Sequence, residues 1–164
     1  MSASVYVSLG SNVEPEINIQ KAVQAMRAAF GELRLSPVYR SAAVGFEGDD
    51  FLNLVAGFET SDSLHAVVAS SRLIEDELGR DRSQPKFSPR PIDLDILLFA
   101  DQVIDEPGIQ IPRRDIVKQA FVLKPLQDLA GDDLHPQTGQ SYAELWLEML
   151  AQAPRLDLVE LDLG

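Results

Sequence analysis

The chain has no cysteine and only two histidines among its 164 residues. The absence of cysteine excludes disulfides, cysteine-ligated zinc, iron–sulfur clusters and a cysteine nucleophile. Two histidines cannot form a histidine-rich metal site, and we interpret His65 as a helix-surface residue and His135 as a turn residue. A Ser/His/Asp triad is equally unsupported, and neither a GxxxxGK[ST] nor a GxGxxG motif occurs, so neither a P-loop nor a dinucleotide fold is supported.

Basic residues are also in short supply, with 14 Lys and Arg against 26 Asp and Glu and a net charge of −12. A field of this sign argues against partners such as nucleic acid or an anionic membrane. No run approaches the roughly 18 apolar residues of a membrane span, and the N-terminus MSASVYVSLGSN lacks the basic and apolar regions of a signal peptide. We therefore expect a cytoplasmic protein with no nucleic-acid and no membrane partner.

What the chain does contain is enough apolar sequence for one core, since 45% of its residues are hydrophobic. We expect a single domain over residues 1–164. Periodicity and turn residues predict strands and helices in the order β-α-β-β-α-β, at residues 4–9, 17–30, 33–44, 51–59, 63–78 and 92–99. This order is typical of a ferredoxin-like α+β sandwich, a sheet with helices on one face. A less regular C-terminal extension follows, with a strand near 103–104, helices at 121–129 and 142–150, and an edge strand at 156–163.

Two aspartates interrupt the apolar strand IDLDILLF. Residues i and i+2 of a strand point to the same face, so Asp93 and Asp95 present two carboxylates side by side, with Leu94 and Ile96 facing the other way. Adjacent carboxylates repel each other unless a proton or a cation lies between them, and Mg²⁺ is the natural candidate because it prefers hard oxygen ligands. A solvent-exposed pair that only aids solubility is the alternative on spacing alone.

Half of the basic residues flank this aspartate strand: Arg80, Arg82, Lys86, Arg90, Arg113, Arg114 and Lys118. Four of them lie in GRDRSQPKFSPRP, a Pro-interrupted segment too long for a simple turn. Each cluster alone could be a solvated loop, but cations beside a carboxylate-held metal suit a polyphosphate. The combination favours a nucleotide site.

Candidates for a second substrate are fewer. Asn53 lies within the strand DFLNLVAGF, where a buried amide must find partners, although an exposed position is an even alternative. Phe51, Phe87 and Phe121 lie in or beside loops or element ends, and core packing is the alternative for each.

These segments resemble one known family. VYVSLGSN, FLN at 51–53, the helix end at 75–79, GRDR, SPRPIDLDILLF and FVLKPL are similar, in order and spacing, to the 6-hydroxymethyl-7,8-dihydropterin pyrophosphokinases of folate biosynthesis. The likeness runs from about residue 4 to 142, and RPIDLDILLF is its most specific part. It implies a ferredoxin-like enzyme that moves the terminal pyrophosphoryl group of ATP to the hydroxymethyl group of a reduced pterin and releases AMP, with ATP and the pterin as its partners. We expect a monomer.

The resemblance also implies residue roles. Asp93 and Asp95 correspond to ligands of two Mg²⁺ ions, and Arg80 and Arg90 to catalytic arginines that neutralise the transferred phosphates. The ATP-binding residues would be Glu75, Arg82, Arg90, Arg113 and Arg114. The pterin-binding residues would be Asn53, which reads the pterin edge, Phe51 and Phe121, which stack on it, and Phe87.

The sequence departs from the family pattern after Pro112. Arg113 replaces a nucleotide-contacting histidine, and Gln119 stands where an arginine is common. Arg113 and Arg114 could compensate for phosphate charge, because arginine is a strong bidentate phosphate ligand, but they cannot reproduce a neutral imidazole. The alternative function is therefore a divergent, non-catalytic paralogue that binds a pterin or a nucleotide.

Overall fold

The computed structural model describes residues 2–42, 50–79 and 91–164. Its main sheet is antiparallel throughout and has the strand order β5-β1-β4-β3-β8, with a short β2 paired to β4. The strands are β1 (Ala3–Ser11), β2 (Arg34–Leu35), β3 (Val38–Ser41), β4 (Phe51–Thr60), β5 (Asp93–Phe99) and β8 (Asp157–Val159). With β2 and β3 counted as the single strand expected at 33–44, the elements from β1 to β5 follow the predicted β-α-β-β-α-β order, and the ferredoxin-like α+β fold is confirmed.

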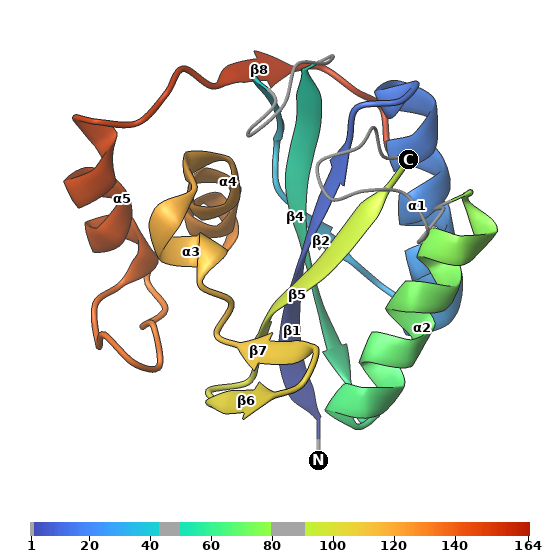
Figure 1. Cartoon of the computed structure of the whole chain (residues 1–164), viewed down its shortest axis with the longest axis horizontal. Helices are drawn as coiled ribbons and strands as arrows, with labels where there is room; N and C mark the ends of the chain where they lie inside the picture. The colour runs from blue at the N-terminus through green and yellow to red at the C-terminus, as the bar shows by residue number, and fades with distance from the viewer. Residues whose placement is uncertain (1, 43–49, 80–90) are drawn as a thin grey trace.

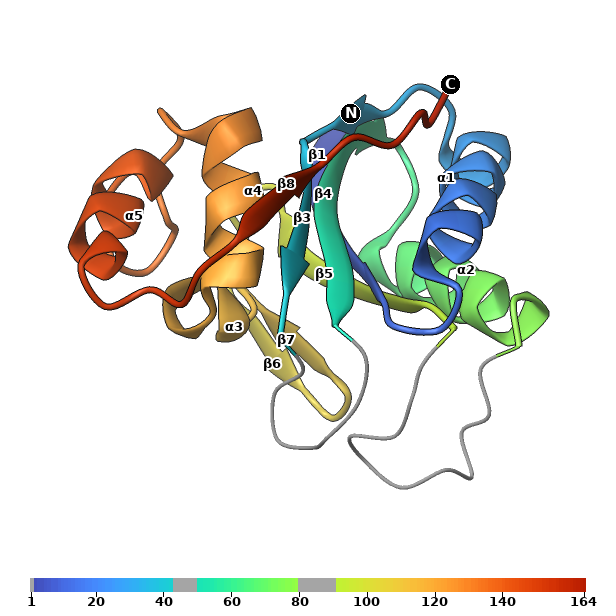
Figure 2. The same ribbon diagram turned by 90° about the horizontal axis from the view of Figure 1, so that it is seen from above.

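Helices cover both faces of this sheet (Figures 1 and 2). α1 (Pro15–Phe30) and α2 (Leu64–Glu77) lie on one face, as predicted. α4 (Ala120–Ala130) packs on the other face, and α5 (Tyr142–Leu150) packs on α4. The helices of the β-α-β-β-α-β part therefore lie on one face as predicted, and the C-terminal extension covers the second face.

The helix boundaries have local causes. Ser63 is the N-cap of α2, and its hydroxyl accepts a hydrogen bond from Ala66 N at 3.2 Å. α1 begins at Pro15, whose missing N–H is no loss in the first turn, and ends before Gly31, where φ is +84°. Among the described residues, no helix combines the length and apolar character that a bilayer span needs.

Some elements differ from the sequence prediction. The strand expected at 33–44 is split into β2 and β3 at Ser36–Pro37, where proline lacks the N–H of a ladder residue. Ser36 stabilises the break, since its hydroxyl accepts from Val55 N at 2.9 Å and its own N–H donates to Val55 O. The hairpin of β6 (Ile104–Glu106) and β7 (Ile109–Ile111) was predicted only in part, and the short helix α3 (Asp115–Lys118) was not predicted.

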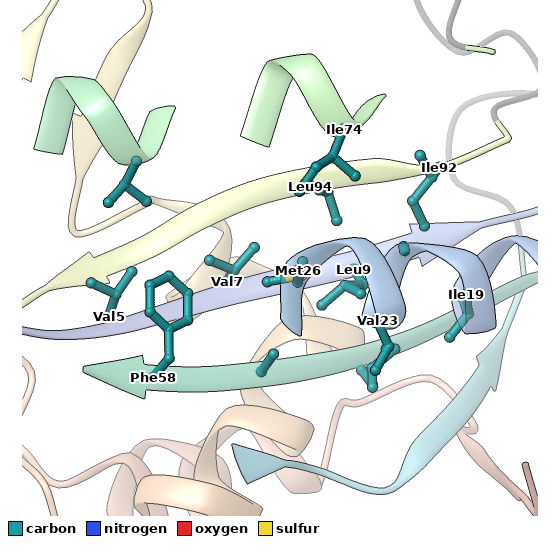
Figure 3. Close-up of a cluster of buried hydrophobic side chains, with 14 of the residues drawn as sticks. Val5, Val7, Leu9, Ile19, Val23, Met26, Phe58, Ile74, Ile92 and Leu94 are labelled. Atoms are coloured by element: carbon teal, nitrogen blue, oxygen red, sulfur yellow. The ribbon is translucent and has the colours of Figure 1, made fainter. Parts of the chain in front are cut away.

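Strand alternation divides the apolar residues between two clusters. Figure 3 shows the first, between the sheet and α1 and α2, built from Val5, Val7, Leu9, Ile19, Val23, Met26, Phe58, Ile74, Ile92 and Leu94 with their neighbours. The second cluster lies between the sheet and α4 and α5, and includes Tyr6, Val55, Leu98, Leu123 and Tyr142. A register shift against β1 interrupts the alternation of β5 after Ile96, so that Leu97 and Leu98 both belong to the second cluster.

Candidate active site

One row of residues crosses three strands on the sheet face that carries the second cluster. β1 places Gly10 directly between Asn53 of β4 and Asp93 of β5. The next row on this face contains Val55, Ser8 and Asp95. Cross-strand partners share a face, so the two aspartates and the amide lie on the same side of the sheet, and Leu94 packs into the core on the other side. The structure thus confirms the predicted facing of Asp93 and Asp95.

At Gly10 the side chains of β4 approach the backbone of β1 closely. A Cβ at Gly10 would lie 2.9 Å from Asn53 Oδ1 and 3.8 Å from Phe51 Cδ1. The glycine therefore leaves room for the amide and for the aromatic ring at the start of β4.

Asn53 is only 6% exposed, and the fold itself orients its amide. Its Nδ2 donates to Ser41 Oγ at 2.9 Å, and Ser41 is on the neighbouring strand β3. The alternative that Asn53 occupies an exposed strand position is therefore wrong. Phe121, in the first turn of α4, lines a groove that also includes Ser41. The structure thus brings Phe51 and Asn53 together and places Phe121 in an adjoining groove; stacking on a pterin stays a prediction.

A cavity of about 170 Å³ lies beside the edge strand β5. Its walls come from α2, β5, the turn and second strand of the β6–β7 hairpin, and Arg113. The lining residues are Val68, Ser71, Arg72, Glu75, Asp93, Leu94, Asp95, Ile96, Gly108, Ile109, Gln110, Ile111 and Arg113. Charged groups and apolar surface meet in this cavity, as a nucleotide with charged phosphates and a flat base requires.

Glu75 joins two walls of the cavity. It is 4% exposed, and its Oε2 accepts a hydrogen bond from Leu94 N at 2.8 Å. Leu94 N–H would otherwise be an open donor on an edge strand. The bond fixes α2 against β5 between the two aspartates, so the predicted ATP-contacting acid does lie at the aspartate pair.

The aspartate pair is electrostatically unfavourable without a cation. Burial, followed by the neighbouring carboxylate of Asp93, raises the pKa of Asp95 to about 7, and Arg113 only partly offsets the rise. The Asp95 side chain keeps 28% of its surface exposed, so solvent and ions reach it.

Arg113 brings a positive charge to Asp95. Its Nη2 is 3.6 Å from Asp95 Oδ1, and its Nε donates to Asp115 Oδ2 at 3.1 Å. Its backbone N donates to Leu97 O at 3.0 Å, which fixes the residue beside β5. Burial opposes the charge, but the carboxylates of Asp95 and Asp115 outweigh it and raise the pKa of Arg113.

Arg114 differs from its neighbour, because it is not among the residues that line the cavity. Its guanidinium lies against the side-chain amide of Gln110, whose oxygen, facing Arg114, accepts from Nε at 2.9 Å. ATP binding by Arg114 stays a prediction. Four other predicted residues, Arg80, Arg82, Phe87 and Arg90, lie outside the described residues.

Sequence reasoning missed the polar residues that α2 contributes. Ser71 and Arg72 line the cavity with Val68 and Glu75, at the i, i+3, i+4 and i+7 spacing of one helix face. Once Glu75 is a candidate, this spacing predicts that Ser71 and Arg72 lie on the same helix face. The hairpin wall, Gly108 to Ile111, had no comparable signal.

The donor set at β5 fits Mg²⁺. Within residues 2–42, 50–79 and 91–164, no three metal-ligating side chains gather around one point. Two carboxylates suffice for Mg²⁺, which keeps several waters and takes further oxygens from substrate phosphates. Asp93 and Asp95 present such oxygens at a partly exposed position, and the repulsion between them favours a cation there.

Comparisons with known proteins agree with this geometry. The chain is 40% identical over 150 residues to 2-amino-4-hydroxy-6-hydroxymethyldihydropteridine pyrophosphokinase of Pseudomonas aeruginosa, covering 88% of this chain and 91% of that protein. It is 36% identical over 136 residues to the protein of the same name from Aquifex aeolicus, covering 82% and 84%. It is 38% identical over 143 residues to the folic acid synthesis protein fol1 of Pneumocystis carinii, of which it spans only 19%.

Solved structures share the fold. A crystal structure of Plasmodium falciparum HPPK-DHPS matches 93% of this chain and 45% of its own with a TM-score of 0.76, at 12% identity. A crystal structure of HPPK-DHPS in complex with substrates matches equally well, with a TM-score of 0.76 over 92% of this chain and 44% of that one. The sequence profile that matches residues 6–131 is that of 7,8-dihydro-6-hydroxymethylpterin-pyrophosphokinase, and this chain belongs to that family.

Proposed function

We propose that this chain transfers the terminal pyrophosphoryl group of ATP to the hydroxymethyl group of 6-hydroxymethyl-7,8-dihydropterin, in folate biosynthesis. The pterin hydroxyl oxygen forms a bond to the β-phosphorus, the bond from that phosphorus to the oxygen of the α-phosphate breaks, and AMP leaves. The hydroxyl proton is released to water. The names of the bacterial relatives support this reaction. The observation that carries it is the row Asn53–Gly10–Asp93, in which a buried amide and the aspartate pair share one face of the sheet.

The pterin side of the site uses neutral groups. Asn53 is held by Ser41 through its Nδ2, so its Oδ1 is oriented over Gly10 and can accept a hydrogen bond from a pterin N–H. Phe51 and Phe121 offer aromatic surface to the flat ring. We assign Phe87 to the same task from the family resemblance.

The nucleotide side uses the cavity beside β5. Asp93 and Asp95 would hold Mg²⁺, which, when bound, neutralises phosphoryl oxygens and helps to align the β-phosphorus with the attacking oxygen. A second Mg²⁺ is part of the proposal. Arg113 adds a fixed positive charge at the same carboxylates, and Glu75 keeps α2 against β5. Arg80, Arg82, Arg90 and Arg114 complete the phosphate-binding set by resemblance.

We further propose that residues 1–164 act as one pyrophosphokinase domain, as a monomer in the cytoplasm. The two apolar clusters share the strands of one sheet, which supports a single folding unit. Light scattering coupled to size exclusion would test the monomer, since a mass near twice 18.0 kDa contradicts it.

The reaction can be tested by its nucleotide product. Incubation with ATP, Mg²⁺ and 6-hydroxymethyl-7,8-dihydropterin should yield AMP and a pterin diphosphate, separated by chromatography. An ordinary kinase would yield ADP, and ADP as the main product contradicts the proposal. Binding of both ligands without any nucleotide product would instead identify the non-catalytic paralogue. A reaction without the pterin serves as the control for hydrolysis of ATP.

A further inference from the structure

Ser71 is a buried hydroxyl that the fold does not use. Ser71 lies in the middle of α2 and is 3% exposed. Among the described residues, its Oγ is the only buried side-chain nitrogen or oxygen without a hydrogen-bond partner. A serine within a helix commonly bonds the carbonyl four residues back, but Ser71 does not. Buried polar groups in folded proteins are almost always paired, so this exception needs an explanation.

The position of Ser71 supplies one. The residue lines the cavity beside β5 together with Glu75, which lies one turn further along α2. α2 and β5 run in opposite directions side by side (Figure 1), and Glu75 is bonded to Leu94 near the start of β5. Ser71 therefore lies about 6 Å along the helix axis away from the Glu75 contact, toward the later residues of β5.

The lining of the cavity changes along the same direction. Val68, the next residue of this helix face beyond Ser71, is apolar, and Ile96 and Ile109 face the same cavity from β5 and β7. The carboxylates of Asp93 and Asp95 and the guanidinium of Arg113 provide the charged part. Arg72 adds a guanidinium at the hairpin turn, where its Nη2 would lie 3.4 Å from a Cβ at Gly108. A nucleotide with its phosphates at the charged groups would place its base against the apolar part, beside the buried and unpaired hydroxyl of Ser71.

We propose that the Ser71 hydroxyl is a binding residue for the base of the nucleotide. A serine hydroxyl can donate to a ring nitrogen of a purine or accept from its amino group, and either bond would pair the buried Oγ. This inference rests on the proposed function and adds a residue to it. In the free protein the hydroxyl is unpaired, and a bond to the base would satisfy it.

The test separates the base from the phosphates. Ser71→Ala and the parent protein are titrated by calorimetry with two probes in Mg²⁺, an unreactive methylene-bridged ATP analogue and inorganic tripolyphosphate, which has no base. We expect Ser71→Ala to bind the ATP analogue about fivefold to tenfold more weakly, the loss of one neutral hydrogen bond, and tripolyphosphate as the parent does. Its melting temperature should not fall, because the removed hydroxyl has no partner in the fold.

Ser70→Ala is the matched control, since it removes a half-buried hydroxyl from the adjacent position, which does not line the cavity. It should bind both probes like the parent. Unchanged binding of the ATP analogue to Ser71→Ala overturns the inference, and so does an equal loss for both probes or a marked drop in melting temperature, which would indicate a structural role. A parent that binds neither probe would overturn the proposed function as well.

Discussion

At the β4 end of the row Asn53–Gly10–Asp93, Asn53 is buried and bonded to Ser41; at the β5 end, Asp93 lies beside Asp95 of the next row, whose side chain is partly exposed. The amide is satisfied by the fold, so its orientation is fixed before any ligand arrives. The aspartates repel each other, and Arg113 relieves the repulsion only in part. One end of the row is therefore built for orientation, and the other is built to receive positive charge.

This difference predicts opposite effects of substitution. Removal of the amide should lower stability and activity together, because its Nδ2 bonds Ser41 and its Oδ1 is the group proposed to bind the pterin. Changes at the carboxylate end should lower activity without lowering stability, because the charges there oppose folding. The two ends can thus be distinguished by measuring activity and stability on the same variants.

The largest effect is expected for Asp95→Asn. This substitution removes one carboxylate charge at nearly constant volume, so kcat should fall on the order of a hundredfold or more. The melting temperature should hold or rise, since the repulsion from Asp93 is relieved. Asp105→Asn, at an exposed carboxylate on β6, is the control and should match the parent. Parent-like turnover of Asp95→Asn at saturating Mg²⁺ would show that Asp95 is not a metal ligand.

Asn53→Ala should damage the other end. We expect KM for the pterin to rise on the order of tenfold to a hundredfold, and the free energy of unfolding to fall by about 1–3 kcal/mol, because Ser41 Oγ loses its buried partner. Ser41→Ala is the matched control: it should lower stability while leaving most of the pterin affinity. Steady-state kinetics and chemical denaturation give the two readouts. A stable Asn53→Ala with raised KM would mean that the Ser41 bond contributes nothing to folding.

A fall in pH should weaken Mg²⁺ binding at the carboxylate end. With a pKa of about 7 in the metal-free protein, Asp95 is increasingly protonated below pH 7, and a cation must then displace a proton. The apparent Mg²⁺ affinity should fall up to about tenfold per pH unit below 7. Titrations of Mg²⁺ at pH 8, 7 and 6 would measure this, and Asp95→Asn should lose the dependence. A flat affinity for the parent would contradict the raised pKa.

Gly10→Ala tests the point where the two ends meet. The added Cβ would lie 2.9 Å from Asn53 Oδ1, so the amide must shift by a few tenths of an ångström. We expect a rise of a few-fold in KM for the pterin, about fivefold, with little change in Mg²⁺ affinity, since the collision is with the amide and not with Asp93. Equal losses of pterin and Mg²⁺ binding would show that the row responds as one unit.

The sequence predicted more of the carboxylate end than of the cavity around it. The facing of Asp93 and Asp95 follows from the two-residue period of a strand, which any pairing must obey. The contact between Asp95 and Arg113 could not be predicted, because it depends on how the β6–β7 hairpin returns the chain to Leu97. Sequence reasoning treated Arg113 and Arg114 alike, whereas the backbone bond of Arg113 to Leu97 directs only one of them to the cavity. The second helical layer was likewise hidden, since an apolar helix does not reveal which sheet face it covers.

The smallest effect concerns His135, which must be separated from Asp95 in any acid titration of stability. His135 is buried in the connection between α4 and α5. Its Nδ1 accepts hydrogen bonds from Gln137 N at 3.1 Å and Thr138 N at 3.2 Å. Burial lowers the pKa of His135 from its model-peptide value of 6.5, so the folded protein favours the neutral ring.

The two groups act with opposite sign. The stability that neutral His135 contributes is present above pH 6.5 and is lost as the pH falls toward its lower folded pKa. The raised pKa of Asp95 makes the folded state bind a proton more tightly than the unfolded chain, so this group adds stability as the pH falls from about 7. In His135→Asn, the side-chain oxygen can still accept the two N–H bonds. We expect the melting temperature of this variant, compared with that of the parent, to be slightly more favourable at pH 5 than at pH 8. For Asp95→Asn, the gain in melting temperature over the parent should instead be larger at pH 8 than at pH 5. Melting curves of both variants at the two pH values check this, and the same pH trend in both would contradict the assignment of opposite shifts.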